Sequence, residues 1–206
     1  MLKSLSKQNV IRGEWAIGKS SFVFLFAGKL IAIKRPFDIL KAMCILRDDS
    51  ELIHLDYTLL VVGDGALRAN CEEFASRERL NVKFVGFLNQ TQIPDAYSIA
   101  DCLILPSERE TWGMVVNEAM ACGTPAIVSD QVGCAPDLVE NGKTGYTYTK
   151  GDIADLANKM KRYLLNPELK NDNGSAAKER VKKYTIDEAV VGVQQAIEFV
   201  YNKNCR

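Results

Sequence analysis

Two glutamates, Glu110 and Glu118, flank the stretch TWGMVVN. The apolar run after Glu110 predicts a helix over residues 112–122, so Glu110 precedes this helix and Glu118 lies within it. At a helical rise of about 1.5 Å per residue, the carboxylates lie on the order of 12 Å apart along the axis and roughly 80° apart around it. Both can then address one side, with the amides of the first turn between them. Carboxylates accept hydrogen bonds from hydroxyl groups, and first-turn amides bind anions.

This pattern fits a nucleotide-sugar, because such a molecule carries a diphosphate between the hydroxyl groups of a sugar and those of a ribose. The donor amides are those of Trp112, Gly113, Met114 and Val115. Two glutamates on a solvated surface have the same spacing, and the residues alone leave both interpretations open.

A second set of candidate residues lies in the basic stretch GKLIAIKRP, residues 28–36. A predicted strand over 22–27 comes before it, and Pro36 opens a predicted helix. In an open α/β sheet, ligands bind at the carboxyl ends of the strands, where Lys29, Lys34 and Arg35 place positive charge. These cations could bind a phosphate, although three basic residues in a loop are more often a solvated surface.

The stretch GEWAIGKS, residues 13–20, matches the phosphate-binding pattern G-x-x-x-x-G-K-[ST] and raises the alternative of a nucleoside triphosphatase. A P-loop follows a strand and opens a helix, because loop amides and the helix N-terminus together bind the phosphates. Here a polar, helix-like segment precedes the motif and the most strand-like run of the chain follows it. We interpret the match as a chance one.

These segments belong to a regular alternation of strands and helices. Short β-branched or apolar runs predict strands at 22–27, 57–62, 82–86, 101–106 and 125–129, with a short one at 145–148. Most of these runs are continuously apolar, which is typical of strands buried on both faces of a parallel sheet. Amphipathic segments predict helices at 36–47, 67–79, 91–100, 112–122, 135–140, 152–165, 168–182 and 185–202. The alternation predicts an α/β fold with a Rossmann-like, doubly wound parallel sheet and a helical C-terminal end.

Glycine turns follow two more of the predicted strands. The turn Gly63-Asp64-Gly65 allows either tight strand-to-helix geometry or the close approach of a ligand. The pair Gly86-Phe87 follows the strand at 82–86, where the phenyl ring could stack on a planar base or pack into the core.

The composition excludes several classes of function. The 206 residues hold 26 Lys and Arg against 26 Asp and Glu, so net charge gives no reason to expect nucleic-acid binding. His54 is the only histidine, which argues against a Ser-His-Asp triad and a zinc site. The six cysteines form no C-x-x-C pair and mostly have apolar neighbours, which predicts reduced, buried thiols in a cytosolic protein. No apolar run reaches about 18 residues, so we expect no transmembrane segment.

Five stretches together resemble the C-terminal, donor-binding domain of glycosyltransferase family 4, also called group 1, which has the GT-B fold. They are FAGKLIAIKRPFDILKA, LLVVGDGALR, VKFVGF, ADCLILPSERETWGMVVNEAMACGTPAIVSD and VGCAPDLVENGKTGY, in the family's order and over more than half of the chain. Glu110 and Glu118 fall on the family's E-x7-E motif. The resemblance implies retaining transfer of a hexose from a UDP- or GDP-sugar to a glycan or lipid acceptor, without a metal or other cofactor.

The resemblance also implies a role for each matching residue. Lys29 and Lys34 neutralise the leaving diphosphate and Glu110 holds the donor sugar's hydroxyls, so these three are the catalytic candidates. Glu118 holds the ribose. The other donor-binding candidates are backbone segments and a loop near the base: Gly28, Gly86, Phe87, Thr111, Trp112, Gly113, Met114 and Val115. Catalysis is then electrostatic stabilisation of the leaving nucleoside diphosphate.

The chain departs from the family in two respects. Many members carry Arg where this chain has Lys29, and Lys keeps the charge but not the planar fork. The family also has a second Rossmann-like domain with the acceptor site. We expect residues 1–206 to be a single nucleotide-sugar-binding domain, with a connector at 1–21 and the acceptor domain absent, that could bind donor and be inactive alone.

The expected partners follow from that domain assignment. A separate acceptor domain or a second copy of the chain would complete the protein. We expect a cytoplasmic location, peripheral to the membrane in the complete enzyme. The alternative is a non-catalytic α/β module that pairs with a separate acceptor-domain protein.

Overall fold

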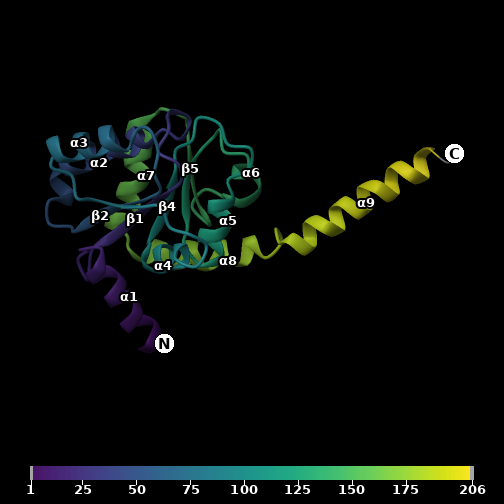
Figure 1. The fold of residues 1–206 in the computed structure, drawn as a ribbon, viewed down its shortest axis with the longest axis horizontal. Helices are drawn as coiled ribbons and strands as arrows, with labels where there is room; N and C mark the ends of the chain where they lie inside the picture. The colour runs from purple at the N-terminus through teal and green to yellow at the C-terminus, as the bar shows by residue number, and fades with distance from the viewer. Residues whose placement is uncertain (1, 205–206) are drawn as a thin grey trace.

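The computed structural model describes residues 2–204. Within them, one sheet of six parallel strands has the order β3-β2-β1-β4-β5-β6 (Figure 1). The strands are β1 Phe22–Ala27, β2 Tyr57–Val62, β3 Val82–Gly86, β4 Cys102–Leu105, β5 Ala126–Ser129 and β6 Gly145–Tyr148. The predicted Rossmann-like, doubly wound sheet is confirmed. The strand order reverses between β1 and β4, and ligands of such sheets bind at the carboxyl ends of the strands beside this point.

Helices connect the strands and close the chain. They are α1 Leu2–Glu14, η1 Ala32–Lys34, α2 Pro36–Arg47, η2 Ser50–Leu52, α3 Arg68–Arg77, α4 Ile93–Ile99, α5 Met114–Ala121, α6 Ala135–Leu138, α7 Ile153–Leu165, α8 Glu168–Val181 and α9 Ile186–Asn204. The ranges predicted at 67–79, 91–100 and 112–122 are one or two residues too long at each end. Most of their outer residues form turns or bends instead.

Two helical layers cover the sheet, and this explains the continuous apolar runs. All six residues of β1 are buried. Val23 and Leu25 belong to the core on the side of α1, α4, α5, α6 and α8. Phe24 and Phe26 belong to the core on the side of α2, α3 and α7. A strand with apolar layers on both faces cannot alternate polar and apolar residues.

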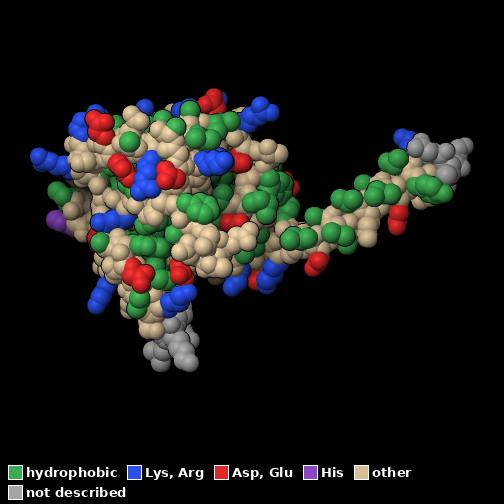
Figure 2. Space-filling model, in the orientation of Figure 1, with side chains coloured by type: hydrophobic (Ala, Val, Ile, Leu, Met, Phe, Trp, Pro, Cys, Tyr) green, Lys and Arg blue, Asp and Glu red, His purple; other side chains and the backbone are tan. Residues whose placement is uncertain are grey.

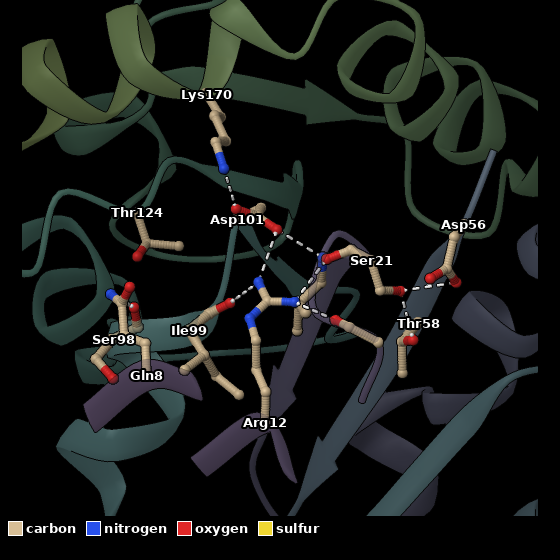
Figure 3. A network of polar contacts seen from close by, with 12 residues as sticks. Gln8, Arg12, Ser21, Asp56, Thr58, Ser98, Ile99, Asp101, Thr124 and Lys170 are labelled. Carbon is tan, nitrogen blue, oxygen red and sulfur yellow. Dashed lines mark hydrogen bonds and ion pairs between the residues drawn. The ribbon is translucent and has the colours of Figure 1, made fainter. Parts of the chain in front are cut away.

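The N-terminal segment, expected to be a connector, contains α1, which packs on α4. Arg12 fixes its end (Figure 3). The guanidinium donates to the carbonyl oxygens of Gly18 (2.9 Å), Ser21 (2.8 Å) and Ile99 (3.2 Å) and lies 3.7 Å from the carboxylate of Asp101. These contacts attach α1 to the amino edge of the sheet.

Asp101, at the start of β4, is the centre of this network. The residue is 8% exposed. Its carboxylate accepts a hydrogen bond from the amide of Val23 (2.7 Å) and pairs with Lys170 of α8 (Figure 3). The network of Arg12, Asp101 and Lys170 therefore joins two helices to the two central strands at the edge opposite the carboxyl ends.

The segment GEWAIGKS starts in the last turn of α1 and ends in the turn before β1. Lys19 is exposed there. The predicted order, helix before the motif and strand after it, is confirmed. The segment lies at the amino edge and has no helix N-terminus after it, so it lacks the geometry that cradles a phosphate.

The helix α9 extends away from the sheet and its helical layers (Figure 1). Hydrophobic side chains are visible along this arm (Figure 2). The exposed large ones are Ile186, Val190, Val191, Val193, Ile197, Phe199, Val200 and Tyr201. Within residues 2–204, no helix is both long and apolar enough to cross a bilayer.

Most of the described thiols lie inside the fold. Cys71, Cys102 and Cys134 are buried, Cys44 is half-buried and Cys122 is exposed, all as free thiols. Cys205 lies outside the described residues. In the part of the chain that the structure describes, no group of three or more His, Cys, Asp or Glu side chains could hold a metal ion.

Candidate functional site

A cleft of about 1100 Å³ opens at the carboxyl ends of β1, β2 and β4, beside the N-terminus of α5. Of the twelve residues to which the resemblance gives a role, eleven line it: Gly28, Lys29, Lys34, Phe87, Glu110, Thr111, Trp112, Gly113, Met114, Val115 and Glu118. Gly86 is not among the lining residues. Its carbonyl oxygen accepts a hydrogen bond from the amide of Gly63 (2.7 Å), which ties the end of β3 to the loop after β2. The structure thus brings the predicted residues together, and their individual roles stay predictions.

Two glycines let the loops after β1 and β2 pack backbone against backbone. A Cβ atom at Gly63 would lie 1.9 Å from the carbonyl oxygen of Gly28, and one at Gly65 would lie 2.5 Å from that of Leu30. Their φ angles are 130° and 156°, which other residues rarely adopt. The chain that approaches these glycines closely is therefore the loop after β1, and this backbone contact holds that basic loop in place at the cleft.

Positive charge enters the cleft from the loop after β1. Lys34 forms an ion pair with Glu110, and these side chains are 21% and 18% exposed. Lys29 is exposed and lines the same cleft. Arg35 differs, because its guanidinium donates to both carboxylate oxygens of Asp38 in α2 (2.7 and 3.2 Å). It is not among the residues that line the cleft, so two of the three predicted cations face it.

Glu110 is held by an extended segment and not by a helix. Its carbonyl oxygen accepts a hydrogen bond from the amide of Gly133 (2.9 Å), and its amide donates to Gln131 (3.3 Å). Because α5 begins only at Met114, the helical rise does not apply to the segment from Glu110 to the start of this helix. The two glutamates nevertheless line one cleft, as expected.

The turn into α5 depends on Gly113. Its φ angle is 101°, and a Cβ atom there would lie 3.2 Å from side-chain carbons of both Leu105 and Val132. The amides of Met114 and Val115 follow at the start of the helix, where no preceding turn supplies acceptors. These donors and the helix dipole favour an anion between the two glutamates.

Trp112 is fixed as part of the cleft wall. Its indole nitrogen donates to Oδ1 of Asn117 (2.8 Å), and its ring centroid lies 6.0 Å from that of Tyr184. Asn117 in turn donates to the backbone of Tyr184 (3.5 Å). The residue just before Gly113 is therefore anchored to the segment between α8 and α9.

Glu118 contacts a second residue of the cleft, a tyrosine that sequence analysis missed. The hydroxyl of Tyr97 in α4 donates to Oε2 of Glu118 (2.6 Å). Burial, and then the hydrogen bond to Glu118, raises the pKa of the Tyr97 phenol. No motif could have identified this residue, because the contact depends on how α4 and α5 pack together.

Phe87 is 76% exposed and lines the cleft, so the alternative that it packs into the core is excluded. Its neighbours Leu88, Asn89, Gln90 and Ile93 line the same wall and were not predicted. An exposed ring in a largely apolar wall can stack on a planar group.

The sequence and the fold are similar to those of known proteins. The family described as glycosyl transferases group 1 matches residues 7–180. N-acetyl-alpha-D-glucosaminyl L-malate synthase of Bacillus anthracis is 26% identical over 189 residues, which cover 92% of this chain and 48% of that protein. The chain spans half or less of the length of the curated relatives it matches.

Solved structures show the same fold. A sucrose-phosphate synthase from Thermosynechococcus elongatus is 26% identical with a TM-score of 0.76, covering 95% of this chain and 49% of that one. The Anabaena protein HepE, solved in complex with UDP and glucose, is 24% identical with a TM-score of 0.77, covering 95% and 52%. The sheet is thus that of the C-terminal domains of GT-B glycosyltransferases. Since the family match covers most of the chain, this protein belongs to the group 1 glycosyltransferases.

Proposed function

We propose that this chain is the donor-binding domain of a retaining glycosyltransferase that transfers a hexose from a UDP- or GDP-sugar to a glycan or lipid acceptor. The observation that carries the proposal is the set of groups that share one cleft. The Lys34–Glu110 pair, the first residues of α5 and Glu118 all line it, and along the chain Glu110 precedes the first amides of α5 while Glu118 lies one turn into that helix. A sugar, a diphosphate and a ribose follow one another in the same order.

The reaction needs stabilisation of charge that develops on the departing nucleoside diphosphate. Lys29 and Lys34 supply positive charge from the loop after β1, and the amides of Met114 and Val115 supply fixed donors. Groups that are already oriented toward developing charge lower the barrier without reorganising during the step. We propose that this electrostatic stabilisation, without a metal ion, is the chain's catalytic contribution.

The two ends of the ligand would be held by the glutamates. Glu110 accepts hydrogen bonds from hydroxyls of the donor sugar, and Glu118 accepts them from the ribose. Phe87 offers an exposed ring for the base. The fold neighbour HepE, solved with UDP and glucose, supports the view that this fold can hold such a ligand.

The acceptor site would be supplied by a second Rossmann-like domain, in the same protein or in a separate chain. A second candidate function is a non-catalytic module that pairs with such a partner. The exposed apolar side chains of α9 favour a partner of some kind in either case. We propose a cytoplasmic location, at the membrane surface for a lipid acceptor.

Binding of UDP, GDP and their hexose conjugates by calorimetry, with melting temperatures in parallel, tests the proposal. We expect one of the two nucleotide series to bind and to raise the melting temperature, with an increase that grows as the logarithm of ligand concentration above Kd. If neither series binds at millimolar concentration while circular dichroism shows an intact fold, the proposed donor-binding function is wrong. The second candidate, a non-catalytic module that pairs with a partner, is then favoured.

A further inference from the structure

Tyr97 is a buried residue that reaches the cleft through a single polar atom. The side chain lies in the core on the side of α4 and α5, and the residue is 4% exposed. It also lines the cleft. Its hydroxyl donates to Oε2 of Glu118 at 2.6 Å. The exposed Glu118 is therefore hydrogen-bonded to a tyrosine whose ring is packed in the core.

The direction of this hydrogen bond is fixed by chemistry. An ionised carboxylate can only accept, so the phenol must donate. Burial raises the pKa of the Tyr97 phenol, and the bond to Glu118 raises it further, so the hydroxyl stays protonated. Oε2 of Glu118 is thereby engaged with Tyr97, and Oε1 is left to accept from a ligand hydroxyl.

The backbone of Tyr97 is held as well. Its carbonyl oxygen accepts a hydrogen bond from the hydroxyl of Thr124 (3.3 Å), just before β5. The ring is packed in the core and the phenol is bonded to Glu118. A glutamate on a helix surface otherwise exchanges between rotamers, and its ordering opposes ligand binding.

We infer that Tyr97 is a positioning residue, which orients the Glu118 carboxylate toward the hydroxyls of a nucleotide ribose. This inference rests on the proposed donor-binding function. The competing interpretation is that the hydroxyl only satisfies its own need for a partner in a buried place. The two differ in what removal of the hydroxyl does to ligands with and without ribose hydroxyls.

The test is the variant Tyr97→Phe, which keeps the ring in the core and removes the donor. Binding is measured by calorimetry for the preferred nucleoside diphosphate, for its 2′,3′-dideoxy form and for inorganic pyrophosphate. The control is Tyr163→Phe, which removes another buried phenol, bonded to Asn173 (3.0 Å) and packed in the core across the sheet. Unliganded melting temperatures show whether both variants fold.

We expect Tyr97→Phe to weaken binding of the ribonucleotide about tenfold, the effect of one hydrogen bond to a charged group. The dideoxy form and pyrophosphate should bind as before, and Tyr163→Phe should change none of the three. Equal loss for the ribose and dideoxy forms, or no loss at all, overturns the inference. If the unsubstituted chain binds neither UDP nor GDP, the proposed function itself fails, which is a different result.

Two further arms keep the test decisive. In a Glu118→Gln background, removal of the Tyr97 hydroxyl should cost much less, since the charged acceptor is gone. A full tenfold loss in that background contradicts the positioning role. If Tyr97→Phe does not fold, Tyr97→Met also lacks the hydroxyl and fills the space with an adaptable side chain.

Discussion

Lys34 and Glu110 form an ion pair in the wall of the cleft, although 76 residues separate them in the chain. The pair joins the loop after β1 to the loop after β4. The strands β1 and β4 flank the point at which the strand order reverses. Each side chain is partly buried and orients the other. One contact therefore fixes the positions of both the cation that we expect at the phosphates and the carboxylate that we expect at the sugar.

Replacement of this cation should weaken diphosphate binding. We expect Lys34→Ala to lower the affinity for UDP or GDP about ten- to a hundredfold, since a hydrogen bond to a charged group contributes about 1.5–3 kcal/mol. Lys34→Arg should keep much of the affinity and its dependence on salt. Calorimetry at low and high ionic strength measures both effects.

The matched control is Lys19→Ala, which removes an exposed lysine of the GEWAIGKS segment at the opposite edge of the sheet. It should leave affinity unchanged. If Lys19→Ala lost more affinity than Lys34→Ala, the phosphates would bind at the amino edge of the sheet, and the triphosphatase alternative would be favoured.

The two glutamates should be separable by ligand. We expect Glu110→Gln to weaken binding of the hexose conjugate about tenfold, because one hydrogen bond to a charged group is altered. The free nucleotide should be affected much less, because the amide oxygen of glutamine can still accept a hydrogen bond from Lys34. Glu118→Gln should weaken both ligands equally. Parallel titrations of each variant with nucleotide and nucleotide-sugar measure these affinities. If Glu118→Gln weakened only the conjugate and Glu110→Gln weakened both ligands, the roles proposed for the two glutamates would be exchanged.

Substitution of Gly63 should destabilise the fold. A Cβ atom at this position meets the carbonyl oxygen of Gly28 at 1.9 Å, and the φ angle of 130° is unfavourable for alanine. We expect Gly63→Ala to lower the free energy of unfolding by about 2–4 kcal/mol. In Gly13→Ala, near the end of α1, nothing lies within 4 Å of the new atom, so it should be neutral or mildly stabilising. Urea denaturation compares them.

The buried network at the amino edge should matter more than a surface pair of the same kind. We expect Asp101→Asn to cost about 3 kcal/mol, because Arg12 and Lys170 lose their shared carboxylate. Asp95→Asn breaks the more exposed pair with Lys7 and should cost at most about 1 kcal/mol. Amide exchange in α1 should accelerate in Asp101→Asn; equal stability of the two variants would contradict the network's role.

Stability should decline at alkaline pH. Burial raises the pKa of Cys71 to about 11 and that of Cys134 to about 12, from an ordinary value of 9.0. Below pH 9 both thiols are protonated in both states and add no pH dependence. Between pH 9 and the folded values they ionise only in the unfolded chain, which then binds fewer protons, so the free energy of unfolding falls as pH rises.

Urea denaturation from about pH 8 to about pH 10.5 measures that decline. Cys134→Ala removes one of the two thiols and should make the decline shallower. An unchanged slope in this variant would assign the alkaline loss of stability to other groups.

Much of this fold follows from local patterns. The bounds of β1, β2, β3 and β6 agree with the ranges predicted from continuous apolar runs. Short runs of this kind are typical of strands covered on both faces, and the turn residues that flank them mark their ends. Helix starts are less well predicted, because residues such as Trp112 continue the apolar pattern although they form a bend.

The site was predictable where charge and glycine follow a strand, as at Lys29, Lys34 and Glu110. Contacts between elements were not. Tyr97 is an ordinary apolar position of α4 until the packing of α5 brings Glu118 to its hydroxyl. Arg35 resembles its basic neighbours in sequence, yet Asp38 draws its side chain away from the cleft.

The buried polar network and the cleft lie at opposite ends of the same strands. The Arg12, Asp101 and Lys170 network holds the amino edge, and the residues that line the cleft follow the carboxyl ends. Substitutions at the exposed residues of the loop at 87–90, unlike those at Gly63, should therefore carry little penalty to folding. A library that randomises residues 87–90 should yield many folded members, and selection among them could redirect the chain to a different base.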